Sequence, residues 1–197
     1  APSFKVGTVL GGIGTRGEKP IVVRAAGPSL APLGVAGALS DPRLEIVGAG
    51  ATAIAANDNW AGSAALTTAM AQVGAFPFLD AGSRDAAVAR DLAAGDYVVD
   101  IAGVDGASGT VIAELYDATR TGTHTVITPR LVNVSVLKVI PARTPLTAGF
   151  VIGGTTAKTV LIRAIGPSLA MFGLADFMVD PQLGLFAGGN PIATNDN

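Results

Sequence analysis

Short runs of alternating or β-branched residues recur along most of the chain. Residues 20–25 (PIVVRA) form a β-branched run that ends at a Gly-Pro pair, which is typical of a buried strand. Residues 43–47 (RLEIV) alternate polar and apolar positions, so they predict a half-buried strand, with residues 52–55 returning as its hairpin partner. Residues 96–101 and 110–116 alternate in the same way. The chain is therefore expected to consist mainly of short strands.

One segment has helical rather than strand character. Residues 61–73 are rich in alanine, and Leu66, Met70 and Val73 fall on one face of a helix. Glycine-containing turns separate the other runs at short intervals. These patterns predict a mainly β fold of antiparallel β-sandwich repeats with one or two short helices.

The chain also repeats part of itself. Residues 19–30 (KPIVVRAAGPSL) return as residues 158–169 (KTVLIRAIGPSL), so that Gly27 corresponds to Gly166. Two downstream motifs recur in the same order: Asp41-Pro42 as Asp180-Pro181, and Asn57-Asp58-Asn59 as Asn195-Asp196-Asn197. Agreement at so many positions indicates a tandem repeat.

The second copy covers only the opening part of a unit. We expect a complete β-sandwich repeat over residues 1–139 and a partial second repeat over residues 140–197, equivalent to about residues 1–59. The backbone of residues 146–197 should then follow that of residues 7–59. Three arrangements stay open at this point. The sequence is a fragment of a longer array, the partial unit packs on the first unit, or a neighbouring molecule completes it.

Unpaired strands are the expected consequence of a partial unit. The second copy predicts strands at residues 147–153 and 159–164, both rich in apolar residues. Their missing partners correspond to residues 96–101 and 110–116 of the first copy. An unpaired strand edge is a template for pairing with another chain.

Composition narrows the classes of function. Charged residues make up 14% of the chain, hydrophobic residues 49%, and the formal net charge is −2, which argues for a folded protein. No basic patch indicates nucleic-acid binding, and no apolar stretch of about 18 residues indicates membrane insertion. The mean hydropathy of +0.51 predicts surface buried against other copies of the chain. Because the chain has no cysteine, disulfides, thiolate metal sites and cysteine nucleophiles are excluded.

An arginine interrupts the apolar run in each copy. Arg24 and Arg163 must be paired if they are buried. The carboxylates that recur with them are Asp41 or Asp58 in the first copy and Asp180 or Asp196 in the second. We interpret Arg24, Asp41, Arg163 and Asp180 as structural residues rather than ligand-binding ones.

The cluster Asn57-Asp58-Asn59 is the candidate metal site. Asn and Asp oxygens suit Ca²⁺, although the spacing is not that of an EF-hand. The structural alternative is an Asx turn, in which these side chains bond to nearby backbone groups. Calcium is thus the single cofactor that the sequence suggests.

No set of residues predicts catalysis. Ser29 and Ser168 lie in GPSL, which differs from the GxSxG of a nucleophile elbow, and the single histidine, His124, has no counterpart in the second copy. We expect both serines to begin short helices, His124 to lie in a loop or an edge strand, and the chain not to be an enzyme.

The repeated strings carry a resemblance. They read VVRAAGPSLA…DPRLEI…AANDNW in the first copy and VLIRAIGPSLA…DPQL…ATNDN in the second. They resemble a repeat that occurs in tandem in large secreted proteins of environmental bacteria, beside immunoglobulin-like domains. Residues 95–109 are also similar to a hairpin of bacterial pre-peptidase C-terminal β-sandwich domains. The resemblance covers nearly the whole chain and implies a secreted β-sandwich module with no catalytic residues.

These observations predict a secreted, non-enzymatic structural protein, located extracellularly or at the cell surface. Its β units would self-assemble with other copies into a filament or surface array through strand-edge and apolar contacts. The alternative is a carbohydrate- or protein-binding accessory or adhesion module of a larger secreted protein, with a surface glycan or a protein as its partner. Besides phenylalanines, only Trp60, Tyr97 and Tyr116 could stack on a sugar, which disfavours glycan binding.

Overall fold

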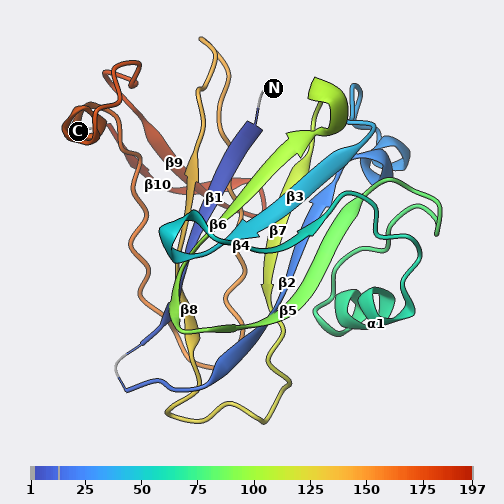
Figure 1. The fold of residues 1–197 in the computed structure, drawn as a ribbon. Coiled ribbons are helices and arrows are strands. Elements are labelled where there is room, and N and C mark those ends of the chain that lie inside the picture. The colour runs from blue at the N-terminus through green and yellow to red at the C-terminus, as the bar shows by residue number, and fades with distance from the viewer. Residues whose placement is uncertain (1–2, 13, 197) are drawn as a thin grey trace. The chain divides into compact units, whose positions relative to one another are not determined.

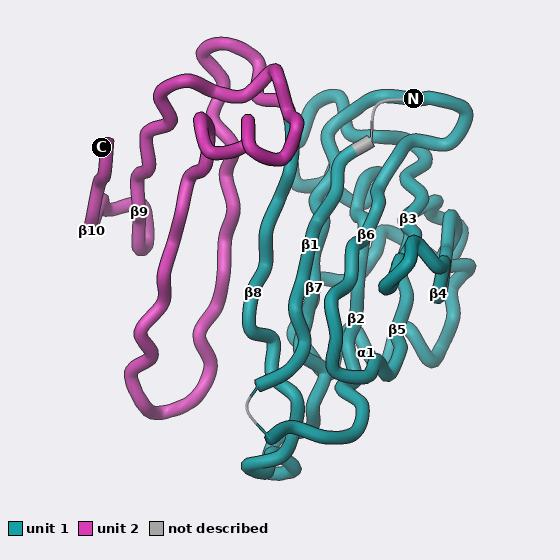
Figure 2. Tube along the Cα trace, turned by 60° about the vertical axis from the view of Figure 1, so that its left-hand side comes forward, with its two compact units in different colours: residues 1–138 teal, residues 139–197 magenta. Residues whose placement is uncertain are grey.

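The chain divides into two compact units, Ala1–Lys138 and Val139–Asn197, here called unit 1 and unit 2 (Figure 2). The computed structural model describes residues 3–12 and 14–196. The division falls one residue before the one expected from the repeat. Within the described residues, no helix has the length and apolar character needed to cross a membrane.

Unit 1 is built mainly of strands (Figure 1). Its strands are β1 (Ser3–Gly11), β2 (Glu18–Ala26), β3 (Pro42–Val47), β4 (Ala53–Asn57), β5 (Ala86–Ala93), β6 (Gly95–Gly103), β7 (Ile112–Asp117) and β8 (Arg130–Leu137). Its helices are η1 (Pro28–Leu33), η2 (Ala49–Ala51), α1 (Ala64–Gln72) and η3 (Val104–Gly106). Apart from α1, these are short 3₁₀ turns, so the predicted mainly β class with few short helices is confirmed.

Two antiparallel sheets form the sandwich of unit 1. One has the strand order β4-β3-β6-β1-β8 and the other β5-β2-β7. All the ladders within both sheets are antiparallel. The predicted β3–β4 hairpin is present, with Leu44 opposite Asn57.

The strands predicted at residues 96–101 and 110–116 are present as β6 and β7, but they do not form the hairpin that the resemblance over residues 95–109 implies. β6 pairs with β1 and β3, whereas β7 pairs with β2 in the other sheet. After β6 the chain turns through η3, where Asp105 has a φ of 52°, and then crosses to the second sheet. Both edges of β6 are already occupied, so β7 can pair only elsewhere. The Asp105-Gly106 pair is a turn signal in the sequence, and such a signal shows that the chain changes direction but not which sheet it joins.

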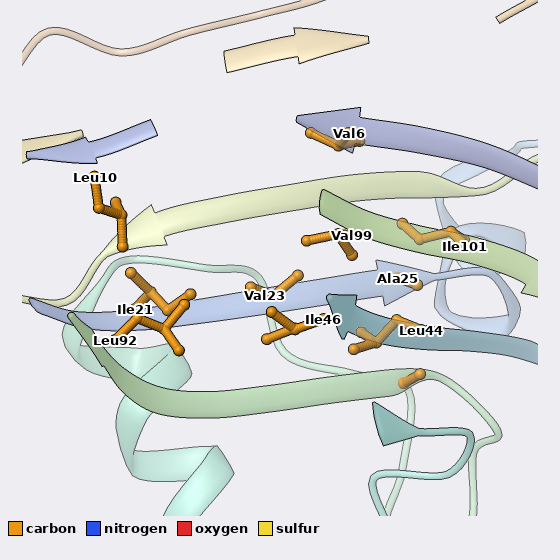
Figure 3. Close-up of a cluster of buried hydrophobic side chains, with 11 residues drawn as sticks. Val6, Leu10, Ile21, Val23, Ala25, Leu44, Ile46, Leu92, Val99 and Ile101 are labelled. Carbon is orange, nitrogen blue, oxygen red and sulfur yellow. The ribbon is translucent and has the colours of Figure 1, made fainter. Parts of the chain in front are cut away.

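The core lies between the two sheets, as Figure 3 shows. It is built by alternate residues of five strands, because successive side chains of a strand point to opposite faces. The buried members are Val6, Leu10, Ile21, Val23, Ala25, Leu44, Ile46, Ala86, Leu92, Val99 and Ile101. The predicted alternation of β3 and β6 is thereby confirmed, with Tyr97 packed at the edge of the same cluster.

A second apolar cluster covers the outer face of the three-stranded sheet. It combines Val22, Ala26, Leu30, Trp60, Met70, Phe78 and Ala87. The predicted helix is α1, whose first turn is capped by the Ser63 hydroxyl. Met70 is buried in this cluster, and Leu66 and Val73 pack against it, as their helical spacing predicted. The three-stranded sheet is therefore covered on both faces.

The described residues of unit 2 form one short 3₁₀ helix and one hairpin. These are η4 (Pro167–Phe172), β9 (Leu183–Ala187) and β10 (Asn190–Asn195), and β9 pairs with β10 antiparallel. The strands predicted at residues 147–153 and 159–164 are absent, so the backbone of unit 2 does not repeat unit 1 there. In unit 1, β1 lies between β6 and β8, and β2 lies between β5 and β7. These 197 residues hold no second copy of those four partners, and a strand needs a partner for its backbone groups.

Candidate functional site

A fully buried arginine lies at the centre of the outer face of the three-stranded sheet. The ladder places Glu114 of β7 directly opposite Arg24 of β2, and Nη1 of Arg24 lies 3.0 Å from Oε2 of Glu114. The guanidinium carbon also lies 4.4 Å from the ring centroid of Phe76 and 4.3 Å from that of Phe78. The contact with Glu114 is an attraction of charges that does not meet hydrogen-bond geometry. The charge of Arg24 is thus balanced by one carboxylate and two aromatic faces.

The expectation that Arg24 is paired within its own unit is correct, but the expected partner is wrong. Asp41 instead binds the exposed Arg84, with Nη1 and Oδ2 2.9 Å apart, and Asp58 is exposed. The ladder between β2 and β7 decides the pairing, because it brings together residues that are 90 positions apart (114 − 24 = 90). The repeat gave no signal for Glu114, since the second copy ends before an equivalent position.

Tyr116 is hydrogen-bonded to the carboxylate of the Arg24–Glu114 pair. Its hydroxyl donates a hydrogen bond to Oε1 of Glu114 at 2.6 Å. Burial, together with the hydrogen bond and the negative charge of Glu114, raises the pKa of Tyr116 to about 12. The phenol therefore stays protonated and remains a donor to Glu114.

A second buried charge, Lys19, lies at the start of β2. Its side chain is fully buried, and Nζ lies 2.7 Å from Oδ2 of Asp117 and 2.9 Å from the hydroxyl of Thr119. Burial alone would raise the pKa of Asp117, but hydrogen bonds from Lys19 and Thr119 outweigh burial and lower it. Sequence reasoning aligned Lys19 with Lys158 but did not recognise Lys19 as a core residue, and Lys158 is exposed.

Residues 27–30 (Gly-Pro-Ser-Leu) form a turn, here called the GPSL turn, as do residues 166–169 in unit 2. In unit 1 this turn is held by Asp85, a buried residue that sequence reasoning missed. Asp85 is fully buried and accepts hydrogen bonds from the backbone N–H of Gly27 at 2.8 Å and of Ser29 at 3.2 Å. It also accepts from the Ser29 hydroxyl and, at 2.7 Å, from the Ser83 hydroxyl. Ser83 in turn accepts from the indole N–H of Trp60 at 3.1 Å. One carboxylate thus joins β5, the GPSL turn and the loop that carries Trp60.

The hydroxyl of Ser29 is fully used in this network. It donates to Asp85 and accepts from the N–H of Leu79 at 2.7 Å, and the residue is 4% exposed. Ser29 follows Pro28 in η1, as predicted for a helix start, and His124 is exposed in the loop before β8. This environment supports a structural role for Ser29.

The second copy of the motif keeps the same turn. η1 begins after Gly27 at φ −119°, ψ −76°, and η4 begins after Gly166 at φ −121°, ψ −85°. Both turns end on a left-handed glycine. A Cβ added to Gly27 would collide with the carbonyl oxygen of Leu39, and one added to Gly166 with that of Met178, the equivalent residue. Only glycine fits this close approach of two backbones in either copy.

The hairpin that follows is also the same in both copies. Leu183 faces Asn195 in unit 2, as Leu44 faces Asn57 in unit 1. The irregularity in pairing falls at the equivalent place in both hairpins. The turn and the hairpin are therefore local structures, which form whether or not the rest of the sandwich is present.

The two copies differ in which residues contact the turn and the hairpin. In unit 2 a hollow of about 300 Å³ lies beside the GPSL turn, with Arg163, Gly166, Ser168 and Asn195 among its lining residues. These are the equivalents of Arg24, Gly27, Ser29 and Asn57. In unit 1, Asp85, Glu114 and β5 contact those four residues.

The structural pair expected in unit 2 is not formed. Arg163 and Asp180 are both exposed, and the described residues include no ion pair of Arg163. The expected pair of Arg163 with Asp180 is therefore absent from the described residues, and pairing of Arg163 elsewhere in its repeat stays a prediction. In unit 1 the carboxylate that pairs with the arginine belongs to β7, and residues 139–197 do not include an equivalent of β7.

Asn57 has the hydrogen bonds of the structural alternative. Its side-chain oxygen accepts from the N–H of Ala87 at 2.9 Å, and its side-chain nitrogen donates to the carbonyl of Asn59 at 2.9 Å. The amide thus joins β4 to β5 across the edge of the sandwich. Among residues 3–12 and 14–196, no group of three or more His, Asp or Glu side chains is placed to hold a metal. Calcium binding at Asn57, Asp58 and Asn59 stays a prediction.

Exposed apolar side chains are concentrated in unit 2 and on β8. Leu161 is 86% exposed and Val151 is 96% exposed. β8 pairs only with β1 among the described strands, and Val132 and Val134 on it are exposed. Trp60, by contrast, is buried, and the hydroxyl of Tyr97 donates to the carbonyl of Ala93. Most of the exposed large apolar side chains are aliphatic, although Phe150, Phe172 and Phe186 of unit 2 are exposed as well.

Comparisons with known proteins add no further constraint. No protein-family model matches the chain, and no curated protein or solved structure is significantly similar to it. The functional argument therefore rests on the residues and their geometry.

Proposed function

We propose that this chain is a secreted, non-enzymatic structural protein whose β-sandwich units assemble into an extracellular filament or surface array. The observation that carries the proposal is the state of unit 2. Its turn and hairpin are formed, whereas apolar residues that the first copy buries are exposed. Leu161 is 86% exposed, and its equivalent Val22 is fully buried.

The exposed residues of unit 2 lie in extended segments without strand partners. Residues 147–153 and 158–164 are equivalent to parts of β1 and β2, whose backbone groups are paired on both sides in unit 1. Pairing with a strand of another chain would satisfy these groups and bury the aliphatic side chains together.

A second open edge gives the assembly a direction. β8 is an edge strand of unit 1 with exposed valines. If unit 2 of one chain is completed by unit 1 of the next, the contact is between different surfaces. Such head-to-tail contacts produce a filament when they do not close into a ring.

The alternative role as a binding module has less support. Trp60 lies in the core of unit 1, and the Tyr97 and Tyr116 hydroxyls bond within the unit. These three residues therefore offer no flat aromatic platform for a sugar.

Size measurement tests the proposal. Light scattering and electron microscopy of the purified chain should find polymers far larger than the 19.5 kDa chain. Leu161→Asp should shorten or abolish them, because it places a charge on a surface that the assembly buries. Val126→Asp is the matched control, since Val126 has the same 86% exposure in a loop of unit 1. A monodisperse 19.5 kDa species for the unmodified chain would contradict the proposal.

A further inference from the structure

We infer that unit 1 binds a second copy of itself through a step that β7 and β8 form at one side of its sandwich. The step consists of the open edge of β7 and the uncovered inner face of β8. Two such steps interlock about a two-fold axis, so that β8 of each copy lies beside β7 of the other. The inference goes beyond the proposed function, because it concerns residues 1–138 alone and does not use unit 2.

The step exists because the two sheets of unit 1 differ in width. A wide sheet of five strands, in the order β4-β3-β6-β1-β8, faces a narrow sheet of three, in the order β5-β2-β7. β4 contacts β5, and β3 contacts both β5 and β2, so the narrow sheet covers the β4 end of the wide one. The strand that the narrow sheet leaves uncovered is therefore β8, which lies at the border of unit 1 in Figure 2.

The side chains of both strands are exposed on the side that faces the step. Val136 of β8 lies opposite Val6 and packs against the core, and Val134, two residues earlier, points to the same face of the sheet. Val134 is nevertheless 51% exposed. On the other side of the step, β7 pairs with β2 alone among the described strands, and its core-facing Leu115 is only partly buried. A strand added to the edge of β7 would cover both side chains.

A second copy of the same step fits this space. A two-fold axis parallel to the strands exchanges the two layers, so the wide sheet of one copy continues into the narrow sheet of the other. β8 of the second copy then pairs with the open edge of β7 and lies opposite β8 of the first copy, across the core between the layers. The contact occurs twice, its four strand edges become paired, and Val134 of each copy is buried against the other.

Charge complementarity favours this pairing over the pairing of like edges. β8 contains Arg130 and no acidic residue, whereas β7 contains Glu114 and Asp117 and no basic residue. β7 ends and β8 begins at the same end of unit 1, where the loop of residues 118–129 joins them (Figure 1). The axis preserves that end, so the exposed Arg130 of one copy comes beside Asp117 of the other, whose side chain is 35% exposed. Opposite charges on neighbouring strands stabilise their pairing.

Amide hydrogen exchange of the full chain tests the inference directly. Exchange is followed by mass spectrometry at a low and a high concentration of the chain. β7 and β8 should both exchange more slowly at the high concentration, because the second copy hydrogen-bonds their edge amides. β4 and β5, the other two edge strands of unit 1, are internal controls and should exchange equally at both concentrations. Protection of β8 without β7, or of neither strand, would overturn the inference.

Substitutions in β8 test the apolar and the charged part of the contact by sedimentation velocity. Val134→Asp should weaken dimerisation about tenfold or more, because it buries a charge, and Val126→Asp, in an exposed loop, is its control. Arg130→Asp should weaken dimerisation several-fold, less so at high salt, and Arg43→Asp, exposed on β3, is its control. An unchanged Trp60 unfolding transition verifies that each variant is folded. Dimers that tolerate Val134→Asp, or that both arginine variants weaken equally, would contradict the inference.

The outcomes also separate this inference from the proposed assembly. In the Leu161→Asp chain the dimers should persist, because residue 161 lies in unit 2. Dimers without polymers in the unmodified chain would retain the two-fold contact and remove the filament. Polymers that protect β8 and residues 147–164 but not β7 would support the head-to-tail contact and remove the two-fold one.

Discussion

The two copies of the GPSL segment have nearly the same backbone but opposite environments. In unit 1 the β-branched run before the turn is β2, and Val22 and Arg24 within it are fully buried. In unit 2 the equivalent Leu161 and Arg163 are exposed and belong to no strand. The difference shows that the turn is a property of its own residues, whereas the strand and its burial depend on partners brought from elsewhere.

Two acidic residues account for most of this contrast. Asp85 binds the turn and Glu114 pairs with the arginine, and both lie far along the chain, beside β5 and in β7. Unit 2 has neither strand. Trp60 is the single tryptophan and lies in unit 1, so its fluorescence reports the unfolding of unit 1 alone. This readout allows each of the following variants to be compared between the copies.

Removing the carboxylate of Asp85 should have the largest effect. Asp85→Ala leaves the buried N–H groups of Gly27 and Ser29 without an acceptor, and each unsatisfied buried donor costs about 1–3 kcal/mol. We expect unit 1 to lose at least about 3 kcal/mol of unfolding free energy in urea denaturation followed by Trp60. Asp96→Ala, at an exposed position of β6, is the control and should change little. A loss no greater than that of the control would mean that the carboxylate does not hold the turn.

The arginine pair should give the next largest effect. Arg24→Leu leaves the half-buried Glu114 without its cation, and removing one partner of a buried pair costs about 3–5 kcal/mol. The matched variant Arg163→Leu should leave the Trp60 transition unchanged, because Arg163 is exposed in unit 2. Equal effects of the two substitutions, measured by the same denaturation, would refute the contrast between the copies.

Substitutions of Gly27 and Gly166 test the turn, which has the same backbone in both copies. Gly27→Ala forces the turn away from the carbonyl of Leu39 and should cost unit 1 about 1–3 kcal/mol, as overpacked sites do. Gly166→Ala meets the same collision with Met178 but should leave the Trp60 transition unchanged. Backbone NMR shifts of residues 166–173 would then record the distortion in unit 2. If those shifts do not move, the two turns are not equivalent.

The smallest effect concerns alkaline pH. An unfolded tyrosine ionises near pH 10, whereas folded Tyr116 keeps its proton until about pH 12. Between these values the folded state binds more protons than the unfolded state, so the unfolding free energy falls as pH rises. Tyr116→Phe should flatten this decline without removing it, because the pKa of Tyr97 is also raised. Unfolding free energies measured from pH 9 to about pH 12 would check this, and identical slopes would contradict it.

The sequence by itself determined the local elements. Alternation located β3 and β6, alanine-rich helical spacing located α1, and the Gly-Pro pairs located η1 and η4. Matching residues also implied matching turns in the two copies, and both begin and end on equivalent glycines. These features depend on contacts between residues close in the chain, so the pattern of nearby residues is enough to predict them.

Only the tertiary structure decided which strands pair and which charges meet. It put β6 and β7 in different sheets, and it paired Arg24 with Glu114 instead of Asp41. It also placed Asp85 within hydrogen-bonding distance of the GPSL turn. It also left residues 147–153 and 159–164 unpaired, although their apolar runs resemble strands. Hydrogen bonds of a sheet and ion pairs of a core join residues that are distant in sequence. A run of apolar residues therefore becomes a buried strand only when the fold supplies both of its neighbours.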